Sequence, residues 1–133
     1  LGNHGGGGGL INTLKDDKSI EVRIRSAQAI GILNAYTASS TLLTGLGNET
    51  QNPVKIEMIR SLGLLKDKNA VQILLDSIRN FEDLPDIRKE SILSLEKIDD
   101  PAVMPLFFDQ IEIEKHQDTK NLLKKTLRDM LYK

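Results

Sequence analysis

Apolar side chains recur along this chain at intervals of 32 or 33 residues. One series steps by 32 each time, through Leu10, Leu42, Leu74 and Leu106. Another steps by 32, 33 and 32, through Ile30, Leu62, Leu95 and Leu127. A repeat of about 30 to 45 residues is a small unit that cannot bury its apolar face alone, so neighbouring units must stack to share a core. The chain is therefore predicted to form an array of about four similar units.

Each unit is predicted to consist of two helices separated by polar loops. The second helix carries apolar residues at helical spacing over 22–33, 54–65, 87–98 and about 119–131. Shorter first helices are predicted over 10–15, 39–46, 70–79 and 102–111. Proline follows Asn52 and Asp100, and it is well tolerated in a first helical turn after a capping side chain. Asp118 is expected to mark the start of the last helix.

The whole chain, 1–133, is expected to form a single repeat domain. The repeats are predicted to span about 5–33, 34–65, 66–98 and 99–133, and residues 1–4 match the end of a preceding second helix. Glycine fills 5–9, and each glycine costs a helix about 1 kcal/mol relative to alanine, so a helical turn there is expected to be frayed or absent. No Lys-Ser or Lys-Thr directly follows, which argues against a phosphate-binding loop. An engineered junction or unassigned side chains explain the run better.

The composition excludes several classes of function. The 18 basic and 19 acidic side chains nearly cancel, so no large field attracts nucleic acid, and nucleic-acid binding is not expected. Cysteine is absent, which removes disulfides and thiolate metal sites and favours a reducing compartment, so a cytoplasmic location is expected. No apolar run approaches the roughly 20 residues that a bilayer-spanning helix needs, so no membrane insertion is expected.

Two segments resemble a known repeat family. VRIRSAQAIGIL (22–33) and VKIEMIRSLGLLKDKNAVQILLDSI (54–78) combine a Val-Arg or Val-Lys start, small residues in mid-helix and an Ala-Val-x-x-Leu-Leu second half. In these features the chain looks like the HEAT-like repeats first named from phycobilisome lyases, over essentially its whole length. The resemblance implies an all-α, right-handed α-solenoid whose second helices line the concave surface. Such arrays serve as scaffolds, adaptors, chromophore lyases, hydroxylases and DNA-repair enzymes, so fold does not fix function.

Candidate catalytic residues are scarce. His4 and His116 stand in unrelated contexts, and neither has a second histidine or a carboxylate four residues later, the spacing that places two metal ligands on one helical turn. The His-Glu pairs of HEAT-like hydroxylases and the tryptophans of an aromatic groove are absent. Asp16-Asp17 and Asp99-Asp100 fall at predicted turns, where aspartate accepts backbone hydrogen bonds. No catalytic, metal or cofactor site is predicted, and the protein is not expected to be an enzyme.

The outward positions of the second helices carry the candidate interaction site. Five of them are apolar where water is expected: Ile24, Ile32, Ile56, Leu64 and Leu93. Charged side chains flank them: Arg25, Glu57, Arg60 and Glu90. A contiguous apolar surface rimmed by charge is typical of a docking site. Alternatively, the curvature of the superhelix or a missing N-terminal repeat covers these groups.

This face predicts a noncatalytic scaffold or adaptor that holds another protein. The alternative is an accessory subunit of a chromophore lyase or related enzyme, in which the same groove presents a cofactor or chromophore. The partner and the oligomeric state are not specified by any motif.

A basic residue recurs at one further position of every repeat: Arg23, Lys55, Arg88 and Lys120. This position lies only about 20° from that of Ile30 around the helix, toward the packed side. The cation is therefore expected to pair with an acidic loop group rather than to bind a polyanion. The acidic candidates are Asp16, Asp17, Asp67 and Asp83.

Small residues also recur at shared positions. One series contains Ala29, Ser61, Ser94 and Thr126, and another contains Gly31 and Gly63. They predict close approach between neighbouring units. In the last repeat Lys124 and Arg128 replace apolar or small residues, as expected for a terminal unit whose outer face must be wetted.

Overall fold

The computed structural model describes residues 9, 12–14 and 19–133, and regular structure within these residues is entirely helical. The second helices of the hairpins are α2 (Ile20–Ile32), α4 (Asn52–Leu65), α6 (Pro85–Ile98) and α8 (Gln117–Leu131). The first helices are α3 (Ser39–Asn48), α5 (Val71–Arg79) and α7 (Val103–Ile113). Short 3₁₀ turns, Tyr36–Ala38 and Lys68–Ala70, lead into α3 and α5. The predictions for residues 1–8 fall outside the described part of the chain.

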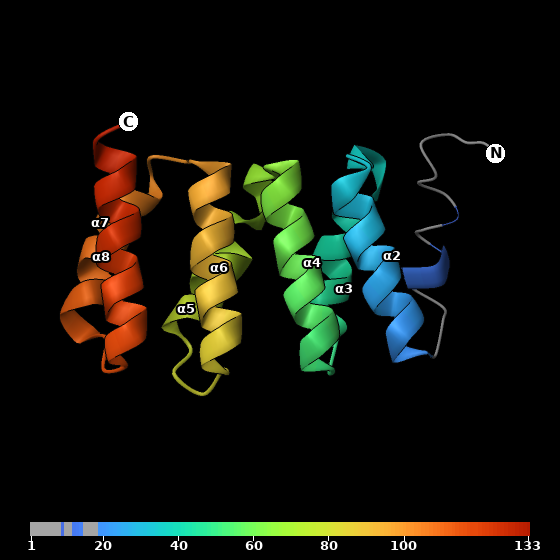
Figure 1. Cartoon of the computed structure of the whole chain (residues 1–133), viewed down its shortest axis with the longest axis horizontal. Helices are drawn as coiled ribbons and strands as arrows, with labels where there is room; N and C mark the ends of the chain where they lie inside the picture. The colour runs from blue at the N-terminus through green and yellow to red at the C-terminus, as the bar shows by residue number, and fades with distance from the viewer. Residues whose placement is uncertain (1–8, 10–11, 15–18) are drawn as a thin grey trace.

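The helices form two layers (Figure 1). α2, α4, α6 and α8 lie side by side in sequence order, and each packs against the next. α3, α5 and α7 lie behind them, each packed on the second helix of its own hairpin, while direct packing among these three is sparse. The prediction of an all-α solenoid of stacked hairpins is confirmed, and its more tightly packed layer is the one made by the second helices.

The apolar series that marks the repeat lies in the core. All members of the second series are buried: Ile30, Leu62, Leu95 and Leu127. In the first series Leu42 and Leu74 are buried, whereas Leu106 is half-buried and its neighbour Phe107 is fully buried. Because burial of one such side chain contributes roughly 1.5–3 kcal/mol, the repeated positions supply a large part of the stability of the stack.

Neighbouring second helices approach closely because glycine faces serine. A Cβ atom at Gly31 would lie 2.6 Å from the Oγ of Ser61, and one at Gly63 would lie 2.6 Å from the Oγ of Ser94. Each serine also donates a hydrogen bond to the carbonyl of the residue four positions before that glycine. The same contacts thus set the same register at the α2–α4 and α4–α6 interfaces, and equivalent residues lie at the same height along adjacent helices.

The helix ends repeat as well. Asn34, Lys66 and Asp99 follow the second helices at equivalent positions and have φ values of 53°, 54° and 57°. At the start of α8 the expected cap is wrong: Asp118 lies inside the first turn, and the Nδ1 of His116 accepts the backbone N–H of Thr119 at 3.3 Å. The helix begins earlier than predicted because the imidazole of His116 caps it.

The last helix presents a polar outer surface. Lys124 is exposed, whereas Ile59 and Ile92 at the equivalent positions of α4 and α6 are buried. Arg128 is likewise exposed where α4 has a buried glycine. These side chains agree with the predicted role of α8 as a terminal cap.

Candidate interaction face

We call the outward surface of α2, α4, α6 and α8 the second-helix face. The structure places the predicted site residues on three adjacent helices of this face: Ile24, Arg25 and Ile32 on α2, Ile56, Glu57, Arg60 and Leu64 on α4, and Glu90 and Leu93 on α6. Because equivalent positions share a height, these residues form rows that cross the layer. The predicted apolar patch is thus brought together from helices far apart in sequence.

The apolar members of the site differ in exposure. Ile32 is 73% exposed and Leu64 is 43% exposed. Ile24 and Ile56 are half-buried and pack against the core, and Leu93 is also half-buried. Ile24 and Ile56 are therefore less outward than predicted, because the close approach of neighbouring second helices covers part of each side chain.

Three of the charged site residues form one network. Arg60 donates from Nη1 to Glu57 at 2.9 Å within α4, and from Nη2 to Glu90 on α6 at 3.0 Å. The hydrogen bond to Glu90 raises the pKa of Arg60 above its ordinary value, although burial acts against it. Arg25 stands apart, in an exposed pair with Glu21 on the same helix at 3.0 Å. The rim of the face is therefore largely charge-balanced.

The recurring inward cations have a structural role in two repeats. At the first interface Arg23 donates from Nε and Nη2 to the two carboxylate oxygens of Glu49, both at 3.1 Å. Glu49 ends α3 and also accepts the backbone N–H of Gln51. Burial alone would raise the pKa of Glu49, but the hydrogen bonds from Arg23 and from Gln51 outweigh it and hold the pKa below its ordinary value.

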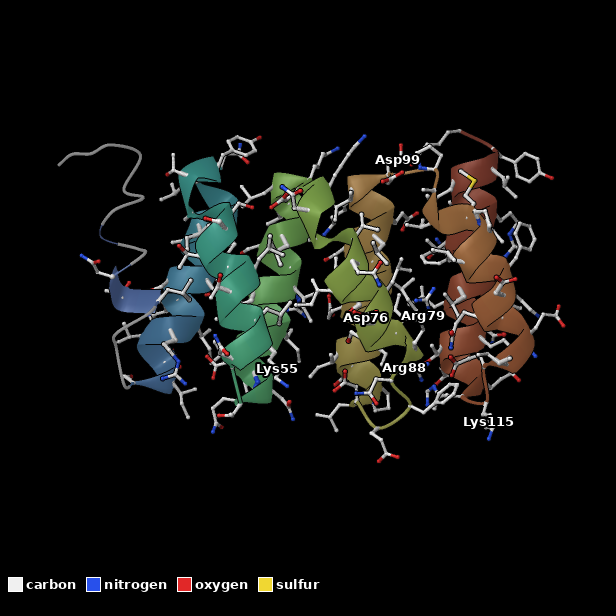
Figure 2. The ribbon with its side chains drawn as sticks, turned by 180° about the vertical axis from the view of Figure 1, so that it is seen from behind. Lys55, Asp76, Arg79, Arg88, Asp99 and Lys115 are labelled. Atoms are coloured by element: carbon white, nitrogen blue, oxygen red, sulfur yellow. The ribbon has the colours of Figure 1, made fainter. Side chains whose placement is uncertain are left out.

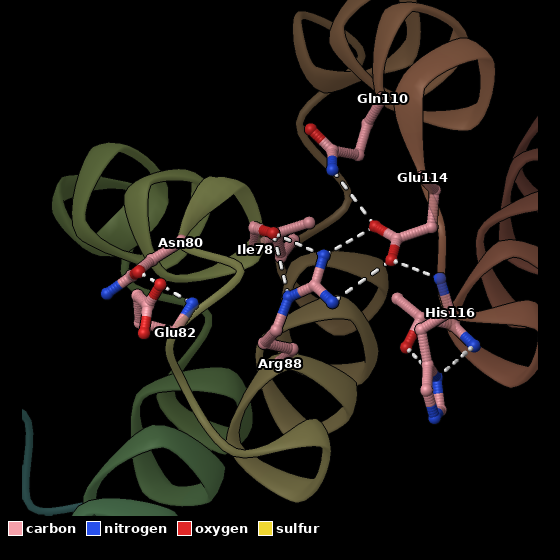
Figure 3. Close-up of polar contacts among 8 residues, drawn as sticks. Ile78, Asn80, Glu82, Arg88, Gln110, Glu114 and His116 are labelled. Atoms are coloured by element: carbon pink, nitrogen blue, oxygen red, sulfur yellow. Dashed lines mark hydrogen bonds and ion pairs between the residues drawn. The ribbon is translucent and has the colours of Figure 1, made fainter.

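The equivalent pair at the last interface is more deeply buried, and Figure 3 shows its polar contacts. Arg88 reaches both carboxylate oxygens of Glu114, the residue that ends α7, and donates from Nε to the carbonyl of Ile78 at 3.0 Å. Gln110 and the backbone N–H of His116 complete the environment of the carboxylate. Burial favours a higher pKa for Glu114, yet these hydrogen bonds together hold its pKa below the ordinary value.

The middle interface lacks such a pair. Lys55 stands at the arginine position, and Asn80 ends α5 where glutamate ends α3 and α7. Asn80 makes the same local contact as those glutamates, because its side-chain oxygen accepts the backbone N–H of the residue two positions later, at 3.0 Å. Within the described part of the chain Lys55 forms no ion pair.

A cavity of about 230 Å³ occupies this middle site. Lys55 and Asn80 line it, together with Asp76, Asp83 and apolar side chains from α3 to α6. Figure 2 shows Lys55 and Asp76 on the side of the molecule away from the second-helix face. At the other two interfaces the positions of Lys55 and Asn80 are taken by an arginine and a glutamate that pair with each other.

Two of the partners predicted for the inward cations, Asp67 and Asp83, are wrong. Asp67 accepts the hydroxyl of Ser39, and Asp83 accepts the hydroxyl of Ser77 at 3.2 Å. Asp16 and Asp17 lie outside the described residues. The missed signal was a spacing, since each paired glutamate follows its arginine by 26 residues.

The comparison with protein families agrees with this geometry. The family of HEAT repeats matches residues 9–80 and 39–128. The chain belongs to the HEAT-repeat family. A search of curated proteins found no match to it.

Among the residues that the structure describes, no group of three or more His, Asp or Glu side chains is placed to hold a metal ion. None of the helices described is both long and apolar enough to cross a membrane. The most deeply buried charged groups, Arg88 and Glu114, form an ion pair with each other. The exposed apolar side chains of the second-helix face have no such structural role.

Proposed function

We propose that this HEAT-repeat protein is a noncatalytic scaffold that binds another protein on its second-helix face. The observation that carries the proposal is the exposure of Ile32 and Leu64, two large apolar side chains at equivalent heights on adjacent helices. Ile24, Ile56 and Leu93 are half-buried and lie on the same face. Apolar side chains that adjoin one another at a surface are typical of a site that a partner covers.

The polar surroundings suit such a site. Arg60 lies among the apolar residues and forms ion pairs with both Glu57 and Glu90, so none of these three charges is unpaired. A partner that covers this region would not have to desolvate an unpaired charge, which is the costly case in interfaces. Charged groups that are already paired, beside apolar ones, therefore support docking of a protein surface.

Substitution of the two exposed residues tests the proposal. Because Ile32 and Leu64 are exposed, Ile32→Asp with Leu64→Asp should leave the helical content unchanged while placing two charges in the apolar patch. Affinity capture from the native host with the wild-type protein should recover partners that this double variant does not. Ile56 is less suitable for the same test because it packs against the core.

A matched control is available on the other layer. Phe108 and Ile113 of α7 are also exposed large apolar residues. Phe108→Asp with Ile113→Asp should recover the same partners as the wild type. Capture that is unaffected by the change at Ile32 and Leu64 would show that the second-helix face is not the binding surface.

Two finer points stand as proposals. We place the protein in the cytoplasm on the absence of cysteine, which a tagged protein in the native host would check. No residue of the described second-helix face calls specifically for a pigment, so an accessory subunit of a chromophore lyase is not our first choice. Colour retained after purification with tetrapyrroles would reverse that choice.

A further inference from the structure

Two rows that cross the second-helix face change in chemistry along the stack. The first runs over α2, α4, α6 and α8 through Ile24, Ile56, Lys89 and Asn121. The second runs in the same order through Ile32, Leu64, Lys97 and Asp129. Both rows are apolar over α2 and α4 and become basic at α6.

The rows are fixed by contacts between the helices. The glycine–serine contacts set the same register at the α2–α4 and α4–α6 interfaces, so positions 32 or 33 residues apart lie at one height. The bond between Arg60 and Glu90, at 3.0 Å, joins α4 to α6 on the face itself. Lys89 therefore continues the line of Ile24 and Ile56, and Lys97 continues the other row.

The two lysines of α6 are available to a partner. Lys89 and Lys97 are exposed, and neither forms an ion pair with any residue for which the structure gives a position. Two other cations on the face are already engaged, because Arg25 pairs with Glu21 and Lys125 pairs with Asp129. The face thus combines an apolar region over α2 and α4 with unpaired positive charge over α6.

The spacing of the rows matches the dimensions of an α-helix. Packed helices lie about 8–10 Å apart, and seven residues of a helix rise about 10.5 Å, so side chains seven apart on a crossing helix meet successive second helices. The two rows are eight residues apart along α2, which corresponds to about 12 Å, close to the diameter of a helix with its side chains. A helix can therefore lie across the layer between the two rows.

We infer that the partner segment is an amphipathic helix that crosses α2, α4 and α6, with apolar side chains over the first two and carboxylates over Lys89 and Lys97. This inference rests on the proposed function and specifies the chemistry of its partner. The crossing helix would cover Arg60, which is already paired with Glu57 and Glu90. Acidic groups are selected because they alone among charged side chains are attracted to the free lysines.

Two synthetic helical peptides test the charge requirement. Each peptide carries two pairs of leucines, one pair for each row of the face. The two leucines of a pair are seven residues apart, and a charged residue follows the second leucine by another seven. One peptide has glutamates at the charged positions and the other has lysines. Titration in low salt should show the glutamate peptide binding the full chain roughly tenfold more tightly, and the difference should shrink as salt screens the exposed charges.

Charge reversal on the protein completes the test. Lys89→Glu with Lys97→Glu should reverse the preference in favour of the lysine peptide. The control Lys68→Glu with Arg79→Glu changes the net charge equally at exposed positions outside the second helices, and it should leave the preference unchanged.

The possible failures can be told apart. Equal binding of both peptides, lost in the Ile32→Asp, Leu64→Asp variant, would overturn the acidic partner and leave the docking face intact. Failure of both peptides to bind would overturn the crossing helix, whereas the proposed function is decided separately by capture of native partners with the same variant.

Discussion

The first and last interfaces of the stack contain the same ion pair in different surroundings. The side chains of Arg23 and Glu49 are 15% and 7% exposed, whereas those of Arg88 and Glu114 are 4% and 0% exposed. Arg88 also lies 5.1 Å from the centre of the Phe81 ring. The repeat determines which residues meet, and the neighbouring loops determine how completely water is excluded from them.

The contact between neighbouring second helices shows the opposite difference, because glycine is present at the first two interfaces and not at the last. Gly31 and Gly63 allow close contact at the first two interfaces, but Glu96 occupies the equivalent position on α6. The α6–α8 interface therefore lacks a glycine at the point of closest approach. We infer that the last hairpin depends more strongly on its buried ion pair than the first interface does on Arg23 and Glu49.

Removal of Arg88 should cause the largest loss of stability. Arg88→Met keeps the length of the side chain but leaves the carboxylate of Glu114 buried without its cation, which typically costs about 3–5 kcal/mol. Urea unfolding should show this loss, and amide exchange should accelerate most in α7 and α8. A loss below about 1 kcal/mol would contradict the assigned dependence of the last hairpin on this pair.

Glu114→Gln should cause a smaller loss of stability, and this loss should depend on pH. At pH 7 the loss of hydrogen bonds to a charged group should cost about 1.5–3 kcal/mol. The pKa of Glu114 is lowered by folding, so its contribution is present above the ordinary value of 4.5 and is lost as the pH falls through the lowered value. Urea midpoints of wild type and variant should therefore converge at pH values well below 4.5, and a constant difference would contradict the ion pair.

The first pair should be worth less. Arg23→Met leaves Glu49 with its backbone hydrogen bond and with partial access to water, so we expect a loss of about 1–2 kcal/mol, between the ranges for exposed and buried pairs. The same urea measurement, made beside Arg88→Met, supplies the comparison. Equal losses at both interfaces would show that burial does not govern the value of the pair.

Much of the fold could be predicted from the sequence because the repeat is redundant. The helix predicted over 54–65 is observed as Asn52–Leu65, and the one predicted over 87–98 as Pro85–Ile98. Apolar periodicity is repeated in every unit, so an error in one copy is corrected by the others. The cap of α8 was missed because His116 replaces the usual side chain there.

The polar contacts were harder to predict because the acidic partners lie at the ends of the first helices. The inward position of Arg23 and Arg88 follows from helical geometry, but their partners lie 26 residues later, at the ends of helices whose exact bounds periodicity does not give. The candidate face was predicted as a set of outward positions. The exposure of its side chains varies with the distance between neighbouring helices. The residue pattern of a single helix gives no information about that distance.

Installation of an ion pair at the middle interface should change stability the least. Lys55→Arg with Asn80→Glu restores at the middle interface the residue types found at the other two, and the cavity of about 230 Å³ offers room for the larger side chains. We expect a gain of about 1 kcal/mol, because a partly exposed bidentate pair contributes modestly and Asp76 and Asp83 nearby oppose a further carboxylate. Urea unfolding should show this gain only in the double variant, since Asn80→Glu alone leaves the flexible lysine without the planar fork that binds a carboxylate with two hydrogen bonds.

Lys55→Met should change stability by less than about 0.5 kcal/mol, because Lys55 has no ion pair to lose within the described chain. A large loss in Lys55→Met would mean that the middle interface already uses this lysine, and the cavity would then not mark the absence of a third pair.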